Sequence, residues 1–275
     1  MGELRFADSS DRLVHKKLEK GDLSNDYIFD KAQQIVKKAN ENGLLLRLLG
    51  ATAFIYHCPA HAHLYEQLDR RLTDVDVVTY SKFKSTDIEK TFKDLGFEKQ
   101  RHYVWHAESR EIYYNEDGLF VDVFLDELNF SHVIDFRGRL ELDDPTITIE
   151  DLLFEKLQIH DITEKDFKDV IVLLLEHEFG SKDNREELDT NYIAKVLAND
   201  WGFYYDATNN LKKIADFASK FELLNDEEKA KVKDKIDRLL DIIESEPKSK
   251  KWLRRAKKGT KKKWYNEVGD IQQGV

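Results

Sequence analysis

Residues 71–78 read RLTDVDVV, and this stretch decides the fold that the sequence predicts. Two carboxylates, Asp74 and Asp76, lie two positions apart in an otherwise apolar, β-branched run that is typical of a strand. Because strand side chains alternate, both carboxylates share one face, with Cα atoms roughly 6.6 Å apart. Two like charges this close raise each other's pKa unless a cation lies between them. The stretch therefore predicts a divalent cation site, for which Mg²⁺ is the usual hard cation.

A glycine turn lies upstream of the acidic strand. Residues 44–49 form a short apolar run, most simply a buried strand, and residues 50–56 continue as a tight turn into a helix. A helix that opens after a glycine presents unpaired backbone N–H groups and the positive end of its dipole, and both attract phosphate. Gly50 would allow a phosphate to approach the backbone closely, and the Thr52 hydroxyl is a further hydrogen-bond donor. This turn predicts a phosphate site.

A third carboxylate, Asp122, lies in the later run FVDVF at residues 120–124. An Asp flanked by strand-forming residues is unexpected unless something pairs with it. A glycine-led phosphate turn, a paired Asp strand and a later single Asp strand together indicate a two-metal nucleotidyl-transfer site. In such a site Asp74 and Asp76 would bridge both Mg²⁺ ions. Asp122 would bind the ion that activates the acceptor hydroxyl and could also take its proton.

The rest of the chain predicts an α+β fold in two parts. Residues 26–42 and 87–95 carry apolar side chains at helical spacing, and short strands lie between and after them. Beyond the middle of the chain the pattern is helical almost throughout, most clearly at residues 226–245. We therefore expect a small mixed β-sheet core with flanking helices over residues 1–145. An all-helical domain with a basic tail would follow over residues 146–275.

Composition narrows the class of protein. The chain has 275 residues, of which 41% are hydrophobic, so it can bury a sizeable core. It has no apolar run near the ~20 residues that span a bilayer, and its first residues are polar. The single cysteine, Cys58, excludes an intramolecular disulfide framework. These features predict a soluble, cytoplasmic protein without a membrane partner.

Charge is distributed unevenly. The net charge is −10, but residues 248–275 hold ten basic residues against two acidic ones, which leaves +8 in this tail and −18 elsewhere. Residues 248–265 also interleave the cations with Trp252, Trp264 and Tyr265. Cations with aromatics suit single-stranded nucleic acid, so RNA is one predicted partner. A solvated or disordered tail, or a tail docked onto the acidic body, are the alternatives.

Four segments resemble the polymerase-β-type nucleotidyltransferase superfamily. Residues 47–57 (RLLGATAFIYH), 70–78 (RRLTDVDVV) and 119–124 (LFVDVF) are similar to its branch of abortive-infection toxin-type transferases. Residues 146–174 resemble the downstream segment of that branch, so the likeness covers roughly residues 28–175. The resemblance implies an enzyme that moves an NMP from an NTP such as ATP to an acceptor hydroxyl and releases pyrophosphate. It also implies an antitoxin as a candidate partner.

The resemblance assigns roles to further residues. Lys156 would contact the triphosphate, and Lys165, Asp166 and Asp169 would contact phosphate or hold Lys156 in place. The family's turn commonly reads Gly-Gly or Gly-Ser, whereas this chain has Gly50-Ala51 and lacks that hydroxyl, for which Thr52 is the expected substitute. The resulting nucleotide-binding set is Gly50, Ala51, Thr52, Arg71, Thr73, Lys156 and Lys165.

The acceptor stays open at this stage. RNA, such as a tRNA end, a small molecule as in aminoglycoside-modifying relatives, and a protein hydroxyl all compete. A fold that binds nucleotide or RNA without turnover is a further alternative. His57, Cys58, His61 and His63 lie close together, but their spacing does not match a closed zinc framework, so we expect a partly exposed loop there.

Overall fold

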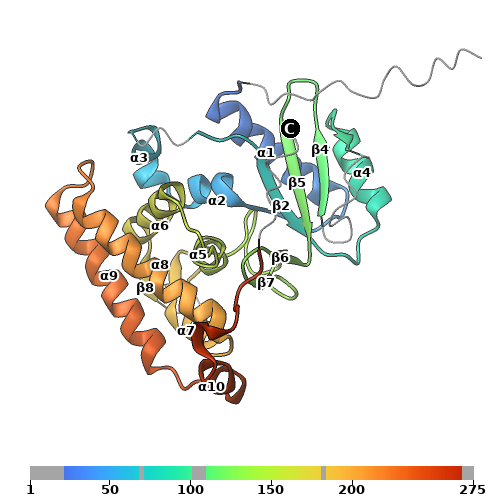
Figure 1. Ribbon diagram of the computed structural model, residues 1–275. Coiled ribbons are helices and arrows are strands. Elements are labelled where there is room, and N and C mark those ends of the chain that lie inside the picture. Colours follow the sequence, from blue (N-terminus) through green and yellow to red (C-terminus); the bar gives the residue numbers. More distant parts are fainter. Residues whose placement is uncertain (1–21, 68–70, 101–109, 181–183, 268–275) are drawn as a thin grey trace, which may run out of the picture.

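The computed structural model describes residues 22–67, 71–100, 110–180 and 184–267 (Figure 1). A mixed sheet of five strands forms the first part of the fold, in the order β1-β2-β5-β4-β3. β2 and β5 run parallel and the other neighbours are antiparallel. The strands are β1 (Leu46–Leu49), β2 (Val75–Thr79), β3 (Glu98–Lys99), β4 (Arg110–Tyr114) and β5 (Phe120–Leu125). The predicted small mixed sheet is therefore confirmed.

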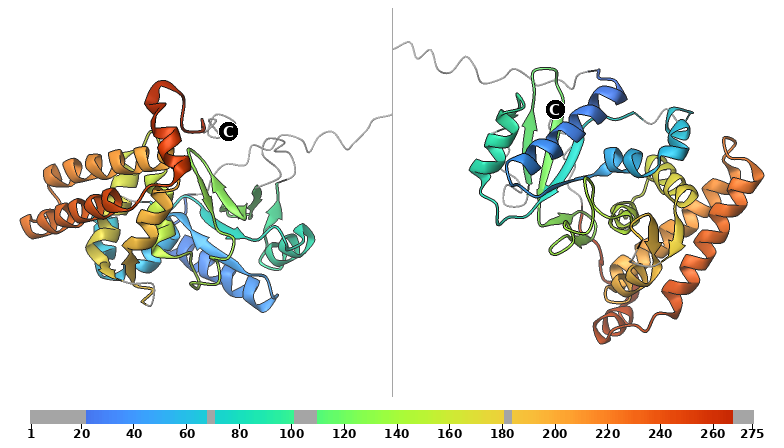
Figure 2. Two further views of the ribbon diagram at one scale, coloured as in Figure 1. Left: turned by 90° about the horizontal axis from the view of Figure 1, so that it is seen from below. Right: turned by 180° about the vertical axis from the view of Figure 1, so that it is seen from behind.

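Helices flank this sheet. α1 (Asn25–Glu41) buries the apolar stripe predicted for residues 26–42, and the Ser24 side chain caps it by accepting the Tyr27 N–H. α2 (Gly50–His57) starts directly after β1, as the glycine turn predicts. α4 (Ser85–Lys93) packs beside α1 and β3. Figure 2 shows α1 lying across one face of the sheet. Two short helices, η2 (Pro59–His61) and α3 (Ala62–Gln67), follow α2.

The second part is helical, as predicted, and it also holds two short strands that the sequence analysis did not predict. The strands pair in parallel as β8 (Glu178–Gly180) and β9 (Glu187–Asp189). Before the second part, the hairpin β6 (Glu127–Asn129) and β7 (Val133–Asp135) continues from β5. The helices are α5 (Ile149–Leu157), α6 (Glu164–Glu176), α7 (Thr190–Leu197), α8 (Trp201–Lys220), α9 (Asp226–Ser245), α10 (Lys250–Ala256) and η3 (Gly259–Lys261).

Side-chain caps explain where two of the helices, α5 and α9, begin. The Thr148 side chain accepts the Asp151 N–H at the start of α5. At α9 the Asn225 and Glu228 side chains each accept the other's backbone N–H, which is a capping box. α9 spans the residues expected from the sequence, because its apolar stripe and its cap agree.

The two parts share an interface. α5 and α6 contact α2, so the helical part packs directly on the helix that follows the glycine turn. The expected boundary near residue 145 stays a prediction. None of the described helices has both the length and the apolar character needed to cross a membrane.

Candidate active site

Three carboxylates gather on one face of the sheet. In the parallel β2–β5 pair, Asp76 lies directly opposite Asp122, and both side chains are half-buried. Register partners on neighbouring strands point to the same face, at a strand spacing of about 4.8 Å. Asp74 immediately precedes β2 and is also half-buried, and the Thr73 hydroxyl donates to its Oδ1 at 2.9 Å. The structure thus brings the predicted acidic strands side by side.

The glycine turn abuts these carboxylates. Leu49 pairs with Asp76 across β1 and β2, and the next residue, Gly50, opens α2 with a φ of 66°. A Cβ atom on Gly50 would lie 2.4 Å from Asp76 Oδ2. Glycine is therefore required here twice, by its positive φ and by the contact with Asp76. The Gly50 N–H donates to Glu155 Oε2 at 3.0 Å, so α5 also supports the turn.

Burial and like charges shape the electrostatics of this face. Burial raises the pKa of Asp76 well above its ordinary value, and the charges of Asp74 and Asp122 raise it further. Burial also raises the pKa of Glu155 to about 7, against the opposing effect of the Lys156 ammonium. Both shifts mean that the folded chain resists a full set of negative charges here. A cation at this face would relieve that penalty.

Arg110 is a site residue that the sequence analysis missed. Its guanidinium donates twice to Asp122, from Nε to Oδ1 at 3.1 Å and from Nη2 to Oδ2 at 2.5 Å. It also lies 5.3 Å from the centre of the Phe124 ring. Arg110 starts β4, whose Ile112 is the register partner of Asp122. Only the pairing of β4 with β5 reveals this contact, because the two residues belong to different strands.

A second cluster surrounds Lys156. Its Nζ lies 3.1 Å from Asp169 Oδ2 and 3.5 Å from Asp166 Oδ1, and 5.3 Å from the centre of the Phe54 ring. Lys156 is nearly buried between α2, α5 and α6. The structure brings together Lys156, Asp166 and Asp169, whereas the Lys165 side chain is exposed.

Of the remaining candidates, Ala51 and Thr52 follow Gly50 on α2, and Arg71 lies shortly before β2. The Thr52 hydroxyl is buried and donates to the Leu49 carbonyl oxygen at 3.3 Å, so it serves its own helix rather than replacing the missing hydroxyl at Ala51. Ala51 is half-buried. The Arg71 side chain is 73% exposed, and its Nη1 lies 3.9 Å from Asp22 Oδ1.

The expectation of a partly exposed loop at the early histidines was wrong for two residues. His57 ends α2 and Cys58 follows it, and both are buried. His61 lies in η2, where its Nδ1 is 2.5 Å from Glu176 Oε2 on α6. The helical part covers this segment, a contact that sequence spacing cannot reveal.

The described part of the basic tail is docked onto the body. The Trp264 indole N–H lies 3.0 and 3.1 Å from the two carboxylate oxygens of Asp206, and the Tyr265 ring stacks on His160 with centroids 3.6 Å apart. The Arg255 guanidinium lies 4.7 Å from the centre of the Trp201 ring. The aromatic side chains therefore anchor the tail.

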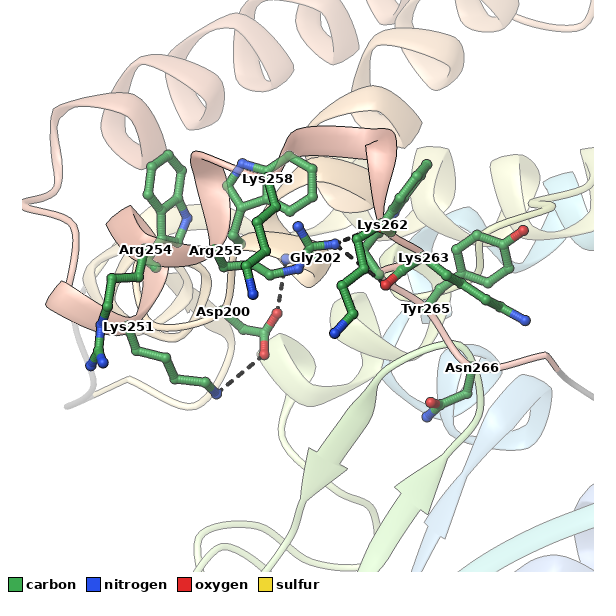
Figure 3. A pocket seen from close by; sticks show the side chains of 13 residues that line it. Asp200, Gly202, Lys251, Arg254, Arg255, Lys258, Lys262, Lys263, Tyr265 and Asn266 are labelled. Atoms are coloured by element: carbon green, nitrogen blue, oxygen red, sulfur yellow. Dashed lines mark hydrogen bonds and ion pairs between the residues drawn. The ribbon is translucent and has the colours of Figure 1, made fainter.

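The docked tail borders an open pocket of about 760 Å³ (Figure 3). Six cations and one carboxylate line this cationic pocket, and Lys258 and Lys262 extend into the same open space near Asp200. The Lys251 Nζ lies 3.5 Å from Asp200 Oδ2. The lining residues are Asp200, Trp201, Gly202, Lys251, Trp252, Arg254, Arg255, Lys258, Lys262, Lys263, Trp264, Tyr265 and Asn266.

Comparison with known proteins does not identify the function of this chain. No protein-family profile and no curated protein matches the chain. A crystal structure of an antigenic nucleotidyltransferase-like protein from Paracoccidioides brasiliensis is similar at 13% sequence identity, covering 84% of this chain and 99% of that chain. Its TM-score of 0.41 is too low for the likeness to indicate a function.

Proposed function

We propose that this protein is a metal-dependent nucleotidyltransferase, which moves an NMP from an NTP to an acceptor hydroxyl and releases pyrophosphate. One observation carries the proposal: the Gly50 turn lies against Asp76, and Asp76 lies in register with Asp122. The helix start that would receive phosphate and the carboxylate oxygens that would bind metal are therefore neighbours in the fold.

The residues fit magnesium. Asp74, Asp76 and Asp122 supply only carboxylate oxygens, which are the donors that Mg²⁺ prefers. The absence of a Cβ at Gly50 lets the Asp76 carboxylate pack directly against the glycine backbone. We assign two Mg²⁺ ions to these three carboxylates; when bound, they would polarise the phosphoryl group and make the acceptor hydroxyl a better nucleophile.

The chain's own groups supply binding and orientation. The described first turn of α2 carries no side-chain cap, so its N–H groups after Gly50 are suited to phosphate oxygens. Arg110 orients the Asp122 carboxylate through its paired hydrogen bonds. Lys156, held beside α2 by Asp169, is the cation that we assign to the triphosphate. Asp122 is the candidate to take the proton of the acceptor.

The cationic pocket favours a nucleic acid, such as RNA, as the acceptor. Its six cations face one carboxylate, so a small cationic acceptor would be repelled there, whereas phosphates would be attracted. The tail's aromatics anchor it to the body, so we expect contacts with phosphates rather than stacking on bases. The Asn266 N–H donates to the Ser131 carbonyl oxygen at 2.9 Å, which ties the tail to the turn between β6 and β7, beyond the end of β5.

The test is transfer of label from each α-labelled NTP, with Mg²⁺, to the RNA, protein and small-molecule fractions of a cell extract. We expect label in RNA, and we expect Asp74→Asn and Asp122→Asn each to lower transfer by at least about 100-fold, because each removes a charged metal ligand. Asp87→Asn, an exposed carboxylate on α4, is the matched control and should leave transfer unchanged.

Folding must be measured alongside. Thermal unfolding of the Asp74 and Asp122 variants should stay close to that of the wild type. Transfer that survives in both variants would contradict the two-metal assignment. Label in protein or in small molecules, but not in RNA, would keep the reaction and exclude the nucleic acid acceptor.

A further inference from the structure

Two buried histidines and one glutamate meet at the far end of α2 from the glycine turn. His57 is the last residue of α2, His177 follows α6, and Glu186 lies just before β9. The His57 and His177 side chains are 1% and 3% exposed. One ligand atom from each of the three residues lies within 4.8 Å of the other two. Two imidazoles and a carboxylate are a recurrent ligand set for zinc.

The distances within this cluster suit ligands around one ion. His57 Nδ1 lies 3.5 Å from Glu186 Oε1, and His177 Nδ1 lies 3.5 Å from Glu186 Oε2. Both separations exceed the roughly 2.7–3.2 Å of ordinary N–H···O hydrogen bonds. Two ligand atoms about 2.0–2.2 Å from a tetrahedral zinc ion lie roughly 3.3–3.6 Å apart. Each histidine Nδ1 thus lies at ligand spacing from one oxygen of the Glu186 carboxylate.

His57 carries the second indication. Its Nδ1 is buried and has no hydrogen-bond partner among the described residues. Its Nε2 lies 2.6 Å from Thr146 Oγ1 and 3.8 Å from Asp143 Oδ2. This nearby carboxylate favours a proton on Nε2, which leaves the Nδ1 lone pair directed at the cluster. A metal-binding histidine ordinarily has its other ring nitrogen hydrogen-bonded in this way.

We propose that His57, His177 and Glu186 bind one transition-metal ion of the zinc class, separate from the magnesium site. His177 Nδ1 also lies 3.0 Å from the Glu186 carbonyl oxygen. With the ion bound through Nδ1, the neutral ring would carry its proton on Nε2, which lies 4.0 Å from Cys58 Sγ. Three protein ligands leave one position of a tetrahedral ion for water or a small ligand. The Glu186 side chain is 60% exposed, so the site opens to solvent on that side.

Such an ion would connect three segments of the fold. It would join the end of α2 to the segment after α6 and to the turn before β9. α2 starts at Gly50, and its eight residues span about 12 Å, so the ion would hold the helix at one end while the glycine turn forms the other. We infer a structural role, which does not depend on nucleotidyl transfer.

The test is binding of Zn²⁺ to the full chain by calorimetry in excess Mg²⁺, which keeps the carboxylate face occupied. We expect one Zn²⁺ per chain and a higher unfolding temperature with Zn²⁺. Co²⁺ in place of Zn²⁺ should give the visible absorption of a four-coordinate site. His177→Gln and Glu186→Gln should each weaken binding at least about 10-fold.

His61→Gln and His63→Gln are the matched controls, because both residues lie just after α2 but outside the cluster. They should retain the wild-type affinity. Glu186 lies on an exposed turn, so its variant reports on binding even where a buried histidine variant fails to fold. No stoichiometric binding, equal affinity in Glu186→Gln, or a loss confined to the control variants would overturn the proposal.

Discussion

The carboxylate face of the sheet and the cationic pocket of the tail differ in how their charged side chains are positioned. On the sheet, Asp76 and Asp122 are half-buried and fixed by strand register, with the Gly50 turn in contact. In the pocket, Lys258 and Lys262 are exposed on a short segment that aromatic anchors hold against the body. The sheet therefore fixes the position of each carboxylate, whereas the pocket contributes positive charge without fixing each lysine side chain. We therefore expect single substitutions at the carboxylate face to have large effects. Substitutions in the pocket should have small effects that add up.

The largest effect is expected at the glycine turn. Gly50→Ala places a Cβ 2.4 Å from Asp76 Oδ2 at a residue whose φ is 66°. Either Asp76 or the turn must move, so we expect transfer to fall at least about 100-fold, because a displacement near 1 Å can cost that much. Stability should fall by about 1–3 kcal/mol.

Steady-state labelling and urea unfolding measure these two effects. Gly43→Ala is the matched control, since Gly43 also has a positive φ of 72° but no atom within 4 Å of the added Cβ. It should lose stability and keep activity. Equal activity in Gly50→Ala and wild type would show that the turn does not contribute to the site.

An intermediate effect is expected from Glu155, which links the turn to α5. Its pKa is raised from 4.5 to about 7, mainly by burial, so the folded chain keeps this proton where the unfolded chain loses it. The stability that this group contributes is full below pH 4.5 and is lost as the pH rises to about 7. The loss is at most about 1.4 kcal/mol per pH unit.

Glu155→Gln should remove this dependence, because the amide stays neutral and its oxygen can still accept the Gly50 N–H. We expect the variant to exceed the wild type in stability at pH 8 and to approach it at pH 4.5 in urea unfolding. Glu222→Gln, an exposed carboxylate after α8, should leave the shape of the wild-type curve intact. Parallel curves for wild type and Glu155→Gln would contradict the raised pKa.

The smallest effect is expected in the cationic pocket. Lys258→Ala and Lys262→Ala should each weaken RNA binding a few-fold, and the double variant should reduce the slope of log affinity against log salt by about 1.4. Fluorescence anisotropy with a labelled single-stranded RNA at several salt concentrations measures both quantities. The pair Lys212→Ala and Lys220→Ala on α8 removes the same charge outside the pocket and should change neither. An unchanged slope in the pocket variant would remove the argument for a nucleic acid acceptor.

Local patterns in the sequence predicted much of the fold. The period of two in residues 74–78 (DVDVV) predicted β2 with Asp76 in it, although Asp74 lies just before the strand, and the helical stripes predicted α1 and α9. The glycine after an apolar run predicted the start of α2. Each of these features depends on residues within a few positions of one another, which is why sequence alone reveals it.

The contacts between distant segments could not be predicted in this way. Arg110 meets Asp122 because β4 pairs with β5, and Glu155 meets Gly50 because α5 packs on α2. The same holds for His57 and His177, which are joined only by the packing of the helical part on α2.

The sequence by itself determined where the acidic strands and the glycine turn lie and how the charge is divided between body and tail. The tertiary structure alone decided the register of Asp76 with Asp122, the arginine beside them and the docking of the tail aromatics. The physical reason is that side-chain direction along a strand or helix follows from the local backbone period. Partners across the fold are instead selected by burial and packing among segments far apart in the chain.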